Sequence, residues 1–221
     1  MKIKAAIFDM DGTLINSLFF WDSAWKRMGE KYLGVPSFRP DDDFIKSCQH
    51  MLLSECSAYM NKVFKICDDD AELADFFNQS LEEFYINEAH LKSGAIELLE
   101  HLSSRGIKLC LASATEMKYV KIAIKAHGLD KYFPIVLSCA DLKASKDKPD
   151  IYLKALELLG EDAADTCVFE DSYVALATAR SIGAHTVGLY DKHSYSEKIK
   201  DSAEIFVSDK MRLADIIDDF E

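Results

Sequence analysis

The stretch IFDMDGTL, residues 7–14, places two aspartates directly after an apolar run. Asp9 and Asp11 are two residues apart, so on an extended chain their side chains point the same way and can face one ligand. Carboxylates at close range repel one another, and a hard cation such as Mg²⁺ relieves that repulsion. One acid of such a pair can act as a nucleophile while the other donates and accepts a proton. Taken alone, the pattern is equally that of an ordinary acidic turn.

Further polar residues could complete a site of this kind. Ser113 follows the apolar stretch KLCLA, and Glu170 and Asp171 follow TCVF. The stretch PDIYLKAL is preceded by a lysine cluster, Lys143, Lys146 and Lys148. A hydroxyl and an ammonium group can bind phosphate oxygens, and Asp171 with Glu170 could complete a metal site. Each signal is weak by itself, but their joint appearance at the ends of predicted strands favours a functional site.

The elements that must position these residues alternate along the chain. Apolar stretches predict strands at 3–8, 108–113, 134–138, 166–171, 185–190 and 204–208. Helical spacing of apolar residues predicts helices at 94–105, 117–128, 149–160, 173–184 and 210–220. The alternation predicts an α/β fold with a Rossmann-like parallel sheet covered by helices. Ligands of such sheets bind beyond the carboxyl ends of the strands, where the polar residues lie.

One long segment breaks this alternation. Residues 14–88 contain amphipathic stretches such as LFFWDSAWKRMGEKYL and LADFFNQSLEEFYINEA, and no convincing strand. We therefore expect a helical cap domain at 14–88, inserted into a Rossmann-like core domain formed by 1–13 and 89–221. The many aromatic residues of the cap are expected mainly to pack its own core.

Composition and charge exclude several classes of protein. The chain has 221 residues and a formal net charge of -12, which argues against binding to the phosphate backbone of nucleic acids. Asp9 cuts off the short N-terminal apolar run, so we expect neither a signal peptide nor a membrane span. The six cysteines form no C-x-x-C pair and are expected to be reduced thiols. These features predict a cytoplasmic protein without a nucleic-acid or membrane partner.

The motifs together resemble those of the haloacid dehalogenase (HAD) superfamily. FDMDGTL is similar to its first motif, LASAT to its second, SKDKPDIYLKAL to its third and VFEDS to its fourth. The resemblance covers nearly the whole chain, and the first and fourth motifs are the most specific. It is closest to the branch with a helical cap inserted after the first strand, which includes phosphoglycolate phosphatase-like enzymes and beta-phosphoglucomutase.

This resemblance implies a role for each matched residue. Asp9 matches the nucleophile, which is also a Mg²⁺ ligand. Asp11 matches the general acid/base, which also offers the metal its backbone carbonyl. Ser113 and the N–H of Ala114 match the phosphate-binding motif.

The third and fourth motifs complete the implied site. Asp171 matches a further Mg²⁺ ligand, and Glu170 is its usual acidic companion. Pro149-Asp150 fixes the register of the third motif, so Lys146 aligns with the phosphate-binding lysine, with Lys148 as its rival. The chain departs from the family pattern, without losing a catalytic group, at Asn16, Asp147 and Ala175.

The resemblance implies a Mg²⁺-dependent phosphatase that hydrolyses a small phosphorylated metabolite through an aspartyl-phosphate. A beta-phosphoglucomutase-like sugar-phosphate mutase is the alternative. Mutases of this branch carry a histidine early in the cap and a Gly-x-Ser-Arg loop, whereas Trp21 occupies about the place of that histidine and the loop is absent from the cap. A third hypothesis is a binding module that holds metal and phosphate without turnover.

The cap offers only weak candidates for substrate contacts. Lys46, Gln49 and His50 lie about where the mutase loop would be, and an exposed helix face explains them equally well. The natural substrate and the oligomeric state stay open, with a monomer as the preferred expectation.

Overall fold

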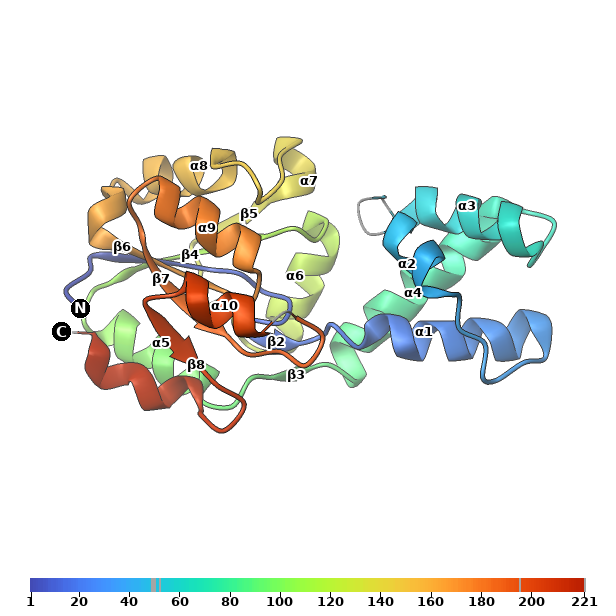
Figure 1. Ribbon diagram of the computed structural model, residues 1–221, viewed down its shortest axis with the longest axis horizontal. Coiled ribbons are helices and arrows are strands. Elements are labelled where there is room, and N and C mark those ends of the chain that lie inside the picture. The colour runs from blue at the N-terminus through green and yellow to red at the C-terminus, as the bar shows by residue number, and fades with distance from the viewer. Residues whose placement is uncertain (49–50, 52, 195, 221) are drawn as a thin grey trace. The chain divides into compact units, whose positions relative to one another are not determined.

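The computed structural model describes residues 1–48, 51, 53–194 and 196–220 (Figure 1). The chain divides into two compact units, Met1–Leu18 with Ala89–Glu221, and Phe19–Glu88. The sequence-based boundary assigned residues 14–18 to the helical segment. The structure places them in the first unit, where β2 (Ile15–Asn16) pairs antiparallel with β3 (His90–Leu91). Two strands of this length carry no readable sequence periodicity, which explains the difference.

A six-stranded parallel sheet forms the centre of the first unit, in the order β5-β4-β1-β6-β7-β8. Its strands are β1 (Ala5–Phe8), β4 (Lys108–Ser113), β5 (Ile135–Ser138), β6 (Thr166–Glu170), β7 (His185–Leu189) and β8 (Ile205–Val207). Helices flank the sheet on both sides, so the predicted α/β fold with a Rossmann-like parallel sheet is confirmed (Figure 1).

The helices of this unit are mostly those predicted. They are α5 (Ala95–Ser104), α6 (Met117–Ala126), α7 (Cys139–Leu142), α8 (Asp150–Leu159), α9 (Tyr173–Ser181), α10 (Ser196–Ser202) and the 3₁₀ helix η2 (Ala163–Asp165). The last predicted helix, at 210–220, is a 3₁₀ helix, η3 (Leu213–Asp219). Its buried residues Leu213 and Ile216 are three apart, a spacing that puts both on one face of a 3₁₀ helix.

Both faces of the sheet are buried, as the apolar strands require. Figure 1 shows α8 and α9 on one side and α5 with the C-terminal η3 on the other. Ala5 and Ile7 of β1 belong to the buried cluster that includes α8 and α9. Phe8, on the opposite face, stacks on Phe169 with ring centroids 4.1 Å apart, and Phe220 lies 5.7 Å from Phe169. The alternation of side chains along β1 thus anchors the strand from both sides.

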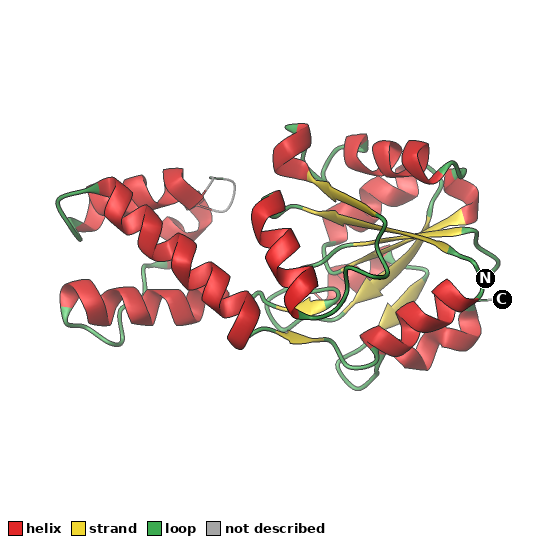
Figure 2. Cartoon of the chain, turned by 180° about the vertical axis from the view of Figure 1, so that it is seen from behind, coloured by secondary structure: helices red, strands yellow, loops and turns green. Residues whose placement is uncertain are grey.

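The second unit is helical in all its described elements (Figure 2). They are α1 (Phe20–Met28), the π-helical turn η1 (Gly29–Leu33), α2 (Asp42–Cys48), α3 (Leu53–Phe64) and α4 (Asp70–Asn87). Aromatic rings pack against one another inside this unit, with ring centroids 4.7 Å apart for Trp21 and Trp25 and 5.7 Å apart for Trp25 and Phe77. Among the described residues of the chain, no helix has the length and apolar character needed to cross a membrane.

Candidate active site

The register of the sheet brings the predicted site residues to one edge. Phe8 is the partner of Leu111 on β4 and of Phe169 on β6, so these three parallel strands end side by side. Asp9 follows Phe8 directly, and β4 and β6 end at Ser113 and Glu170. Since parallel strands present their carboxyl ends at the same edge, the residues that follow them meet there.

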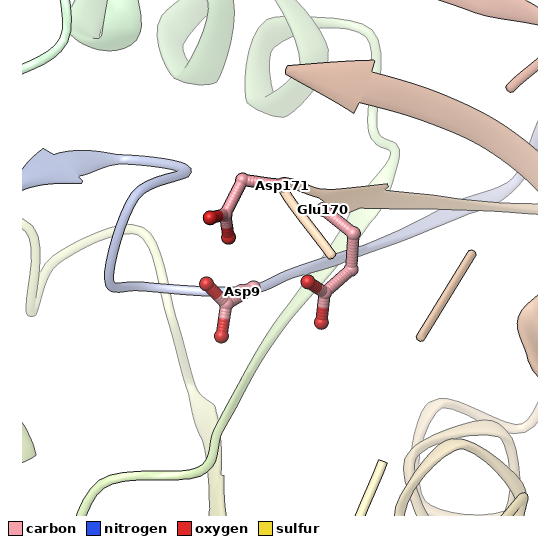
Figure 3. Close-up of side chains that lie close together, drawn as sticks. All are labelled: Asp9, Glu170 and Asp171. Carbon is pink, nitrogen blue, oxygen red and sulfur yellow. The ribbon is translucent and has the colours of Figure 1, made fainter. Parts of the chain in front are cut away.

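Three carboxylates form a buried cluster at this edge. One carboxylate oxygen from each of Asp9, Glu170 and Asp171 lies within 4.8 Å of the others, and Figure 3 shows the three side chains gathered together. The residues are only 6%, 2% and 7% exposed. Water therefore does little to screen the repulsion between them, and the arrangement needs a compensating positive charge.

The pKa values of the three carboxyl groups reflect their burial and mutual repulsion. Burial raises the pKa of Asp9 to about 7, with the negative charges of Glu170 and Asp11 adding to the effect. Burial likewise raises the pKa of Asp171 to about 7, helped by the neighbouring Asp9 carboxylate. Burial also raises the pKa of Glu170. A set of carboxylate oxygens that are hard to ionise alone suits a hard divalent cation, so the residues present fit Mg²⁺.

Lys146 supplies one positive charge from within the cluster. Its ammonium group donates hydrogen bonds to Asp9 Oδ1 and, at 2.5 Å, to Glu170 Oε1. Burial alone would lower the pKa of Lys146, but the Asp9 and Glu170 carboxylates outweigh burial and raise it well above the ordinary value. Lys146 therefore stays charged. The other two lysines of the predicted cluster, Lys143 and Lys148, are exposed.

Tyr152 is a site neighbour that sequence reasoning missed. Its phenolic hydroxyl donates a hydrogen bond of 3.1 Å to Glu170 Oε1 from a buried position on α8. Burial raises the pKa of Tyr152 well above its usual value, so the hydroxyl keeps its proton and acts as a donor. The sequence gives no signal for this contact, because a tyrosine on the buried face of a helix is ordinarily a core residue.

The Asp11 carboxylate accepts hydrogen bonds from two hydroxyl groups. Ser17 Oγ donates to Asp11 Oδ1 at 2.6 Å, and Thr115 Oγ1 donates to Asp11 Oδ2 at 2.8 Å. The backbone N–H of Thr115 donates in turn to Ser113 Oγ at 3.0 Å. Ala114 lies between them and is exposed. Thr115 of the second motif, LASAT, thus contacts Asp11 of the first motif, FDMDGTL. Thr115 was not selected in the sequence analysis.

Asp171 is fixed by residues from two directions. Thr13 Oγ1 donates to its Oδ1 atom at 3.3 Å, and Ser194 Oγ donates to its Oδ2 atom at 2.6 Å. Gly12 approaches the same carboxylate, since a Cβ atom on Gly12 would lie 2.4 Å from Asp171 Oδ2. Gly12 also has φ +82°, a conformation that favours glycine. Both the backbone conformation and the closeness of Asp171 therefore require glycine at position 12 of the DGT motif.

Comparison with known proteins identifies the family. The sequence model described as haloacid dehalogenase-like hydrolase matches residues 3–183. The chain belongs to the haloacid dehalogenase-like hydrolases. The matched range contains the carboxylate cluster and Lys146, whereas Ser194 lies beyond its end.

Individual relatives of this hydrolase extend the comparison. It is 25% identical to "Putative pyrophosphatase PpaX" of Caldanaerobacter subterraneus subsp. tengcongensis, covering 98% of this chain and 96% of that protein. It is 27% identical to "Phosphorylated carbohydrates phosphatase" of Thermotoga maritima, covering 84% of each. Among solved structures, a "putative beta-phosphoglucomutase from Thermotoga maritima" is similar with a TM-score of 0.80 and 25% identity, covering 97% of this chain and 96% of that one.

The structure does not describe the side chains of the three predicted substrate contacts of this HAD-like hydrolase. Gln49 and His50 are outside the described residues. Lys46 belongs to α2, and its side chain is likewise outside the described part of the structure. These three residues stay predictions.

Proposed function

We propose that this hydrolase is a Mg²⁺-dependent phosphatase that acts on a small phosphorylated metabolite through an aspartyl-phosphate on Asp9. The observation that carries the proposal is the buried cluster of Asp9, Glu170 and Asp171, with Lys146 bridging the first two. Carboxylates and an ammonium group in one place suit a metal and a phosphoryl group together. The names of the relatives support the same class of reaction.

Asp9 and Asp11 have different roles in the proposed reaction. The Asp9 carboxylate attacks phosphorus, and the ester oxygen leaves with a proton from Asp11, which forms the aspartyl-phosphate. Asp11 then takes a proton from a water molecule that attacks the phosphoryl group, which releases inorganic phosphate and restores Asp9. The hydroxyls of Ser17 and Thr115 orient the Asp11 carboxylate for this proton transfer.

Other residues bind the charges that accompany these steps. Asp9, Asp171 and the backbone carbonyl of Asp11 would hold Mg²⁺, with Glu170 beside them. When bound, Mg²⁺ supplies positive charge that offsets the carboxylates and polarises a phosphoryl oxygen. In the proposed complex, Lys146 contributes a second positive charge.

The remaining phosphate contacts come from the second motif. In the proposal, Ser113 Oγ and the N–H of Ala114 donate hydrogen bonds to phosphoryl oxygens. Ser113 lies at the end of β4, which pairs directly with β1. Donors fixed at the end of a strand beside that of the nucleophile need no rearrangement as charge develops on the phosphoryl group.

The helical unit Phe19–Glu88 has a proposed role as a cap. It would exclude water from the site and select the substrate, with Lys46, Gln49 and His50 as proposed contacts. Its own aromatic core would allow it to act as a rigid body.

A sugar-phosphate mutase is the second candidate. It is favoured by the similarity, at a TM-score of 0.80, to the structure described as a putative beta-phosphoglucomutase. The two activities differ in the fate of the phosphoryl group. A mutase returns it to another hydroxyl, so the sugar phosphate isomerises without net release of phosphate.

The test measures phosphate release from a panel of p-nitrophenyl phosphate, sugar phosphates, phosphoglycolate and pyrophosphate. Each is assayed with Mg²⁺ and with EDTA, for the wild type, Asp9→Asn and the control Asp130→Asn, whose side chain is exposed. We expect Mg²⁺-dependent release that Asp9→Asn lowers by on the order of 10³-fold or more, and that the control retains.

Other outcomes decide between the alternatives. Release that persists in Asp9→Asn would reject the proposed nucleophile. Isomerisation of a sugar phosphate without net phosphate release would favour the mutase. Binding of Mg²⁺ and phosphate without turnover of any ester would favour a non-catalytic module.

A further inference from the structure

The loop that follows β7 reaches back to the carboxylate cluster. Ser194 Oγ donates to Asp171 Oδ2 at 2.6 Å, a shorter contact than the 3.3 Å between Thr13 Oγ1 and Asp171 Oδ1. Both carboxylate oxygens of Asp171 therefore accept a hydroxyl hydrogen bond. Such bonds fix the rotation of a carboxylate and determine which of its lone pairs remain available to a metal.

Asp191 shapes the loop that carries Ser194. Its Oδ1 atom accepts the backbone N–H of His193 at 2.9 Å, and its carbonyl accepts the N–H of Ser194 at 3.0 Å. An aspartate that bonds the backbone two residues ahead stabilises a tight turn. The side chain of Asp191 is 6% exposed, so the side chain that stabilises the turn is buried.

Lys92 anchors this turn to a different part of the first unit. Its ammonium group donates to Asp191 Oδ2 at 2.8 Å and to the carbonyl of Tyr190 at 2.9 Å. Lys92 follows β3 directly, and its N–H donates to the carbonyl of Leu14 at 2.8 Å. The Lys92 side chain is 15% exposed, so the pair is largely removed from water. A charge-assisted contact of this kind holds the loop in one place.

We infer that residues 190–194 form a positioning loop for Asp171, in which Ser194 orients the carboxylate and the Lys92–Asp191 pair holds Ser194. This inference rests on the proposed function, because it takes Asp171 to be a Mg²⁺ ligand. The loop itself, residues 190–194, lies beyond the matched family range, 3–183. Ser194 is a positioning residue rather than a catalytic one, since it acts through Asp171.

The experiment measures Mg²⁺ binding by isothermal titration calorimetry and by the shift in melting temperature, together with the Mg²⁺ dependence of turnover. Ser194→Ala removes the hydroxyl, and Ser194→Thr keeps one. The matched control is Ser181→Ala, because the Ser181 hydroxyl donates to the Thr178 carbonyl within α9. We expect Ser194→Ala to weaken Mg²⁺ binding by about 10-fold, within the range for residues that orient a metal ligand.

The results for these variants distinguish an orienting role of Ser194 from a purely structural one. If Ser194 orients Asp171, saturating Mg²⁺ restores most of the turnover of Ser194→Ala, Ser194→Thr retains most of the Mg²⁺ affinity, and Ser181→Ala matches the wild type. Equal Mg²⁺ affinity in Ser194→Ala and the wild type would overturn the inference and leave the proposed function standing. A wild type that binds no Mg²⁺ would overturn both.

The loop anchor is tested by a second variant. Asp191→Asn keeps the size of the side chain but removes the charge that pairs with Lys92. We expect it to weaken Mg²⁺ binding in the same direction as Ser194→Ala, and the double variant to be no weaker than the more affected single variant. Independent, multiplying effects of the two substitutions would contradict a shared path to Asp171.

Discussion

At the scale of single residues, the site is defined by an imbalance of charge. Asp9, Glu170 and Asp171 carry three negative charges when ionised, and Lys146 supplies one positive charge, so a net charge of two negative units remains among these four side chains. A divalent cation matches that remainder. The raised pKa values of Asp9 and Asp171, about 7 in each case, show that burial and repulsion disfavour the ionised cluster.

Tyr152 offers a residue-scale test, because a single atom links it to the cluster. Tyr152→Phe removes the hydroxyl that donates to Glu170 Oε1 and leaves the packing of the ring on α8 in place. We expect a loss of about 1–2 kcal/mol in the free energy of unfolding, since Glu170 loses a buried donor. We also expect a fall of about 10-fold in phosphate release, because Glu170 then holds Lys146 less firmly.

The control for this prediction makes the same substitution elsewhere. Tyr132 donates to Glu100 Oε1 at 3.0 Å, in a contact with no link to the carboxylate cluster. Urea denaturation and phosphate release of Tyr132→Phe separate the two effects, since this variant should lose stability only. An unchanged rate in Tyr152→Phe would show that the hydrogen bond does not help to organise the site.

At the scale of elements, the parallel sheet explains why the sequence predicts so much of the site. Asp9, Ser113 and Glu170 could be placed at one edge because each lies at or directly after a buried apolar strand, and parallel register brings those ends together. The strands themselves are readable because both of their faces are apolar.

The contacts that the sequence could not reveal depend on the packing of elements. Ser17 and Thr115 meet at Asp11, and Ser194 meets Asp171, through turns whose geometry has no periodic signal. Tyr152 looks like a core residue in the sequence because its ring is in fact buried in the core. Serine and threonine are also common in loops, so their types alone do not select them.

The turn after β1 gives an element-scale prediction. Gly12→Ala would place a Cβ atom 2.4 Å from Asp171 Oδ2 and force a non-glycine residue to φ +82°. We expect the turn to remain strained, with a loss of about 1–2 kcal/mol in the free energy of unfolding, and Asp171 to be displaced. Mg²⁺ binding and phosphate release should both fall, by about 100-fold or more for a displaced ligand.

Gly128 provides the matched control for the backbone component. It has φ +64°, and a Cβ atom there would meet no other heavy atom within 4 Å. Gly128→Ala should therefore show the conformational cost alone, with normal Mg²⁺ binding. Calorimetric titration of both variants separates strain from displacement, and normal Mg²⁺ affinity in Gly12→Ala would contradict the steric argument.

At the scale of the whole molecule, the net charge of -12 acts against an anionic substrate and in favour of a cation. The electrostatic field of this net charge is screened over about 8 Å at physiological ionic strength, so it cannot replace local contacts with the substrate. In the proposed function, recognition of a phosphoryl group depends on fixed positive charge at the site, and Lys146 is the proposed source, in contact with Asp9 and Glu170.

The raised pKa values also couple the stability of the folded protein to pH and Mg²⁺. Asp9 and Asp171 have pKa values of about 7 in the folded chain, against 3.8 as the ordinary value. Between these values the metal-free folded state binds more protons than the unfolded state, so these groups lower the free energy of unfolding as pH rises from about 4 to about 7. Mg²⁺ requires the ionised carboxylates and competes with those protons.

Mg²⁺ should therefore stabilise the protein strongly at about pH 8 and weakly at about pH 5. The measurement is the difference in melting temperature between Mg²⁺ and EDTA at each pH, for the wild type and for Asp171→Asn. The variant should show a much smaller difference at the higher pH, because it lacks one of the charged ligands. Subtracting the EDTA value at each pH removes the titration of groups elsewhere in the chain. An equal Mg²⁺ increment at both pH values would show that the buried carboxylates do not form the cation site.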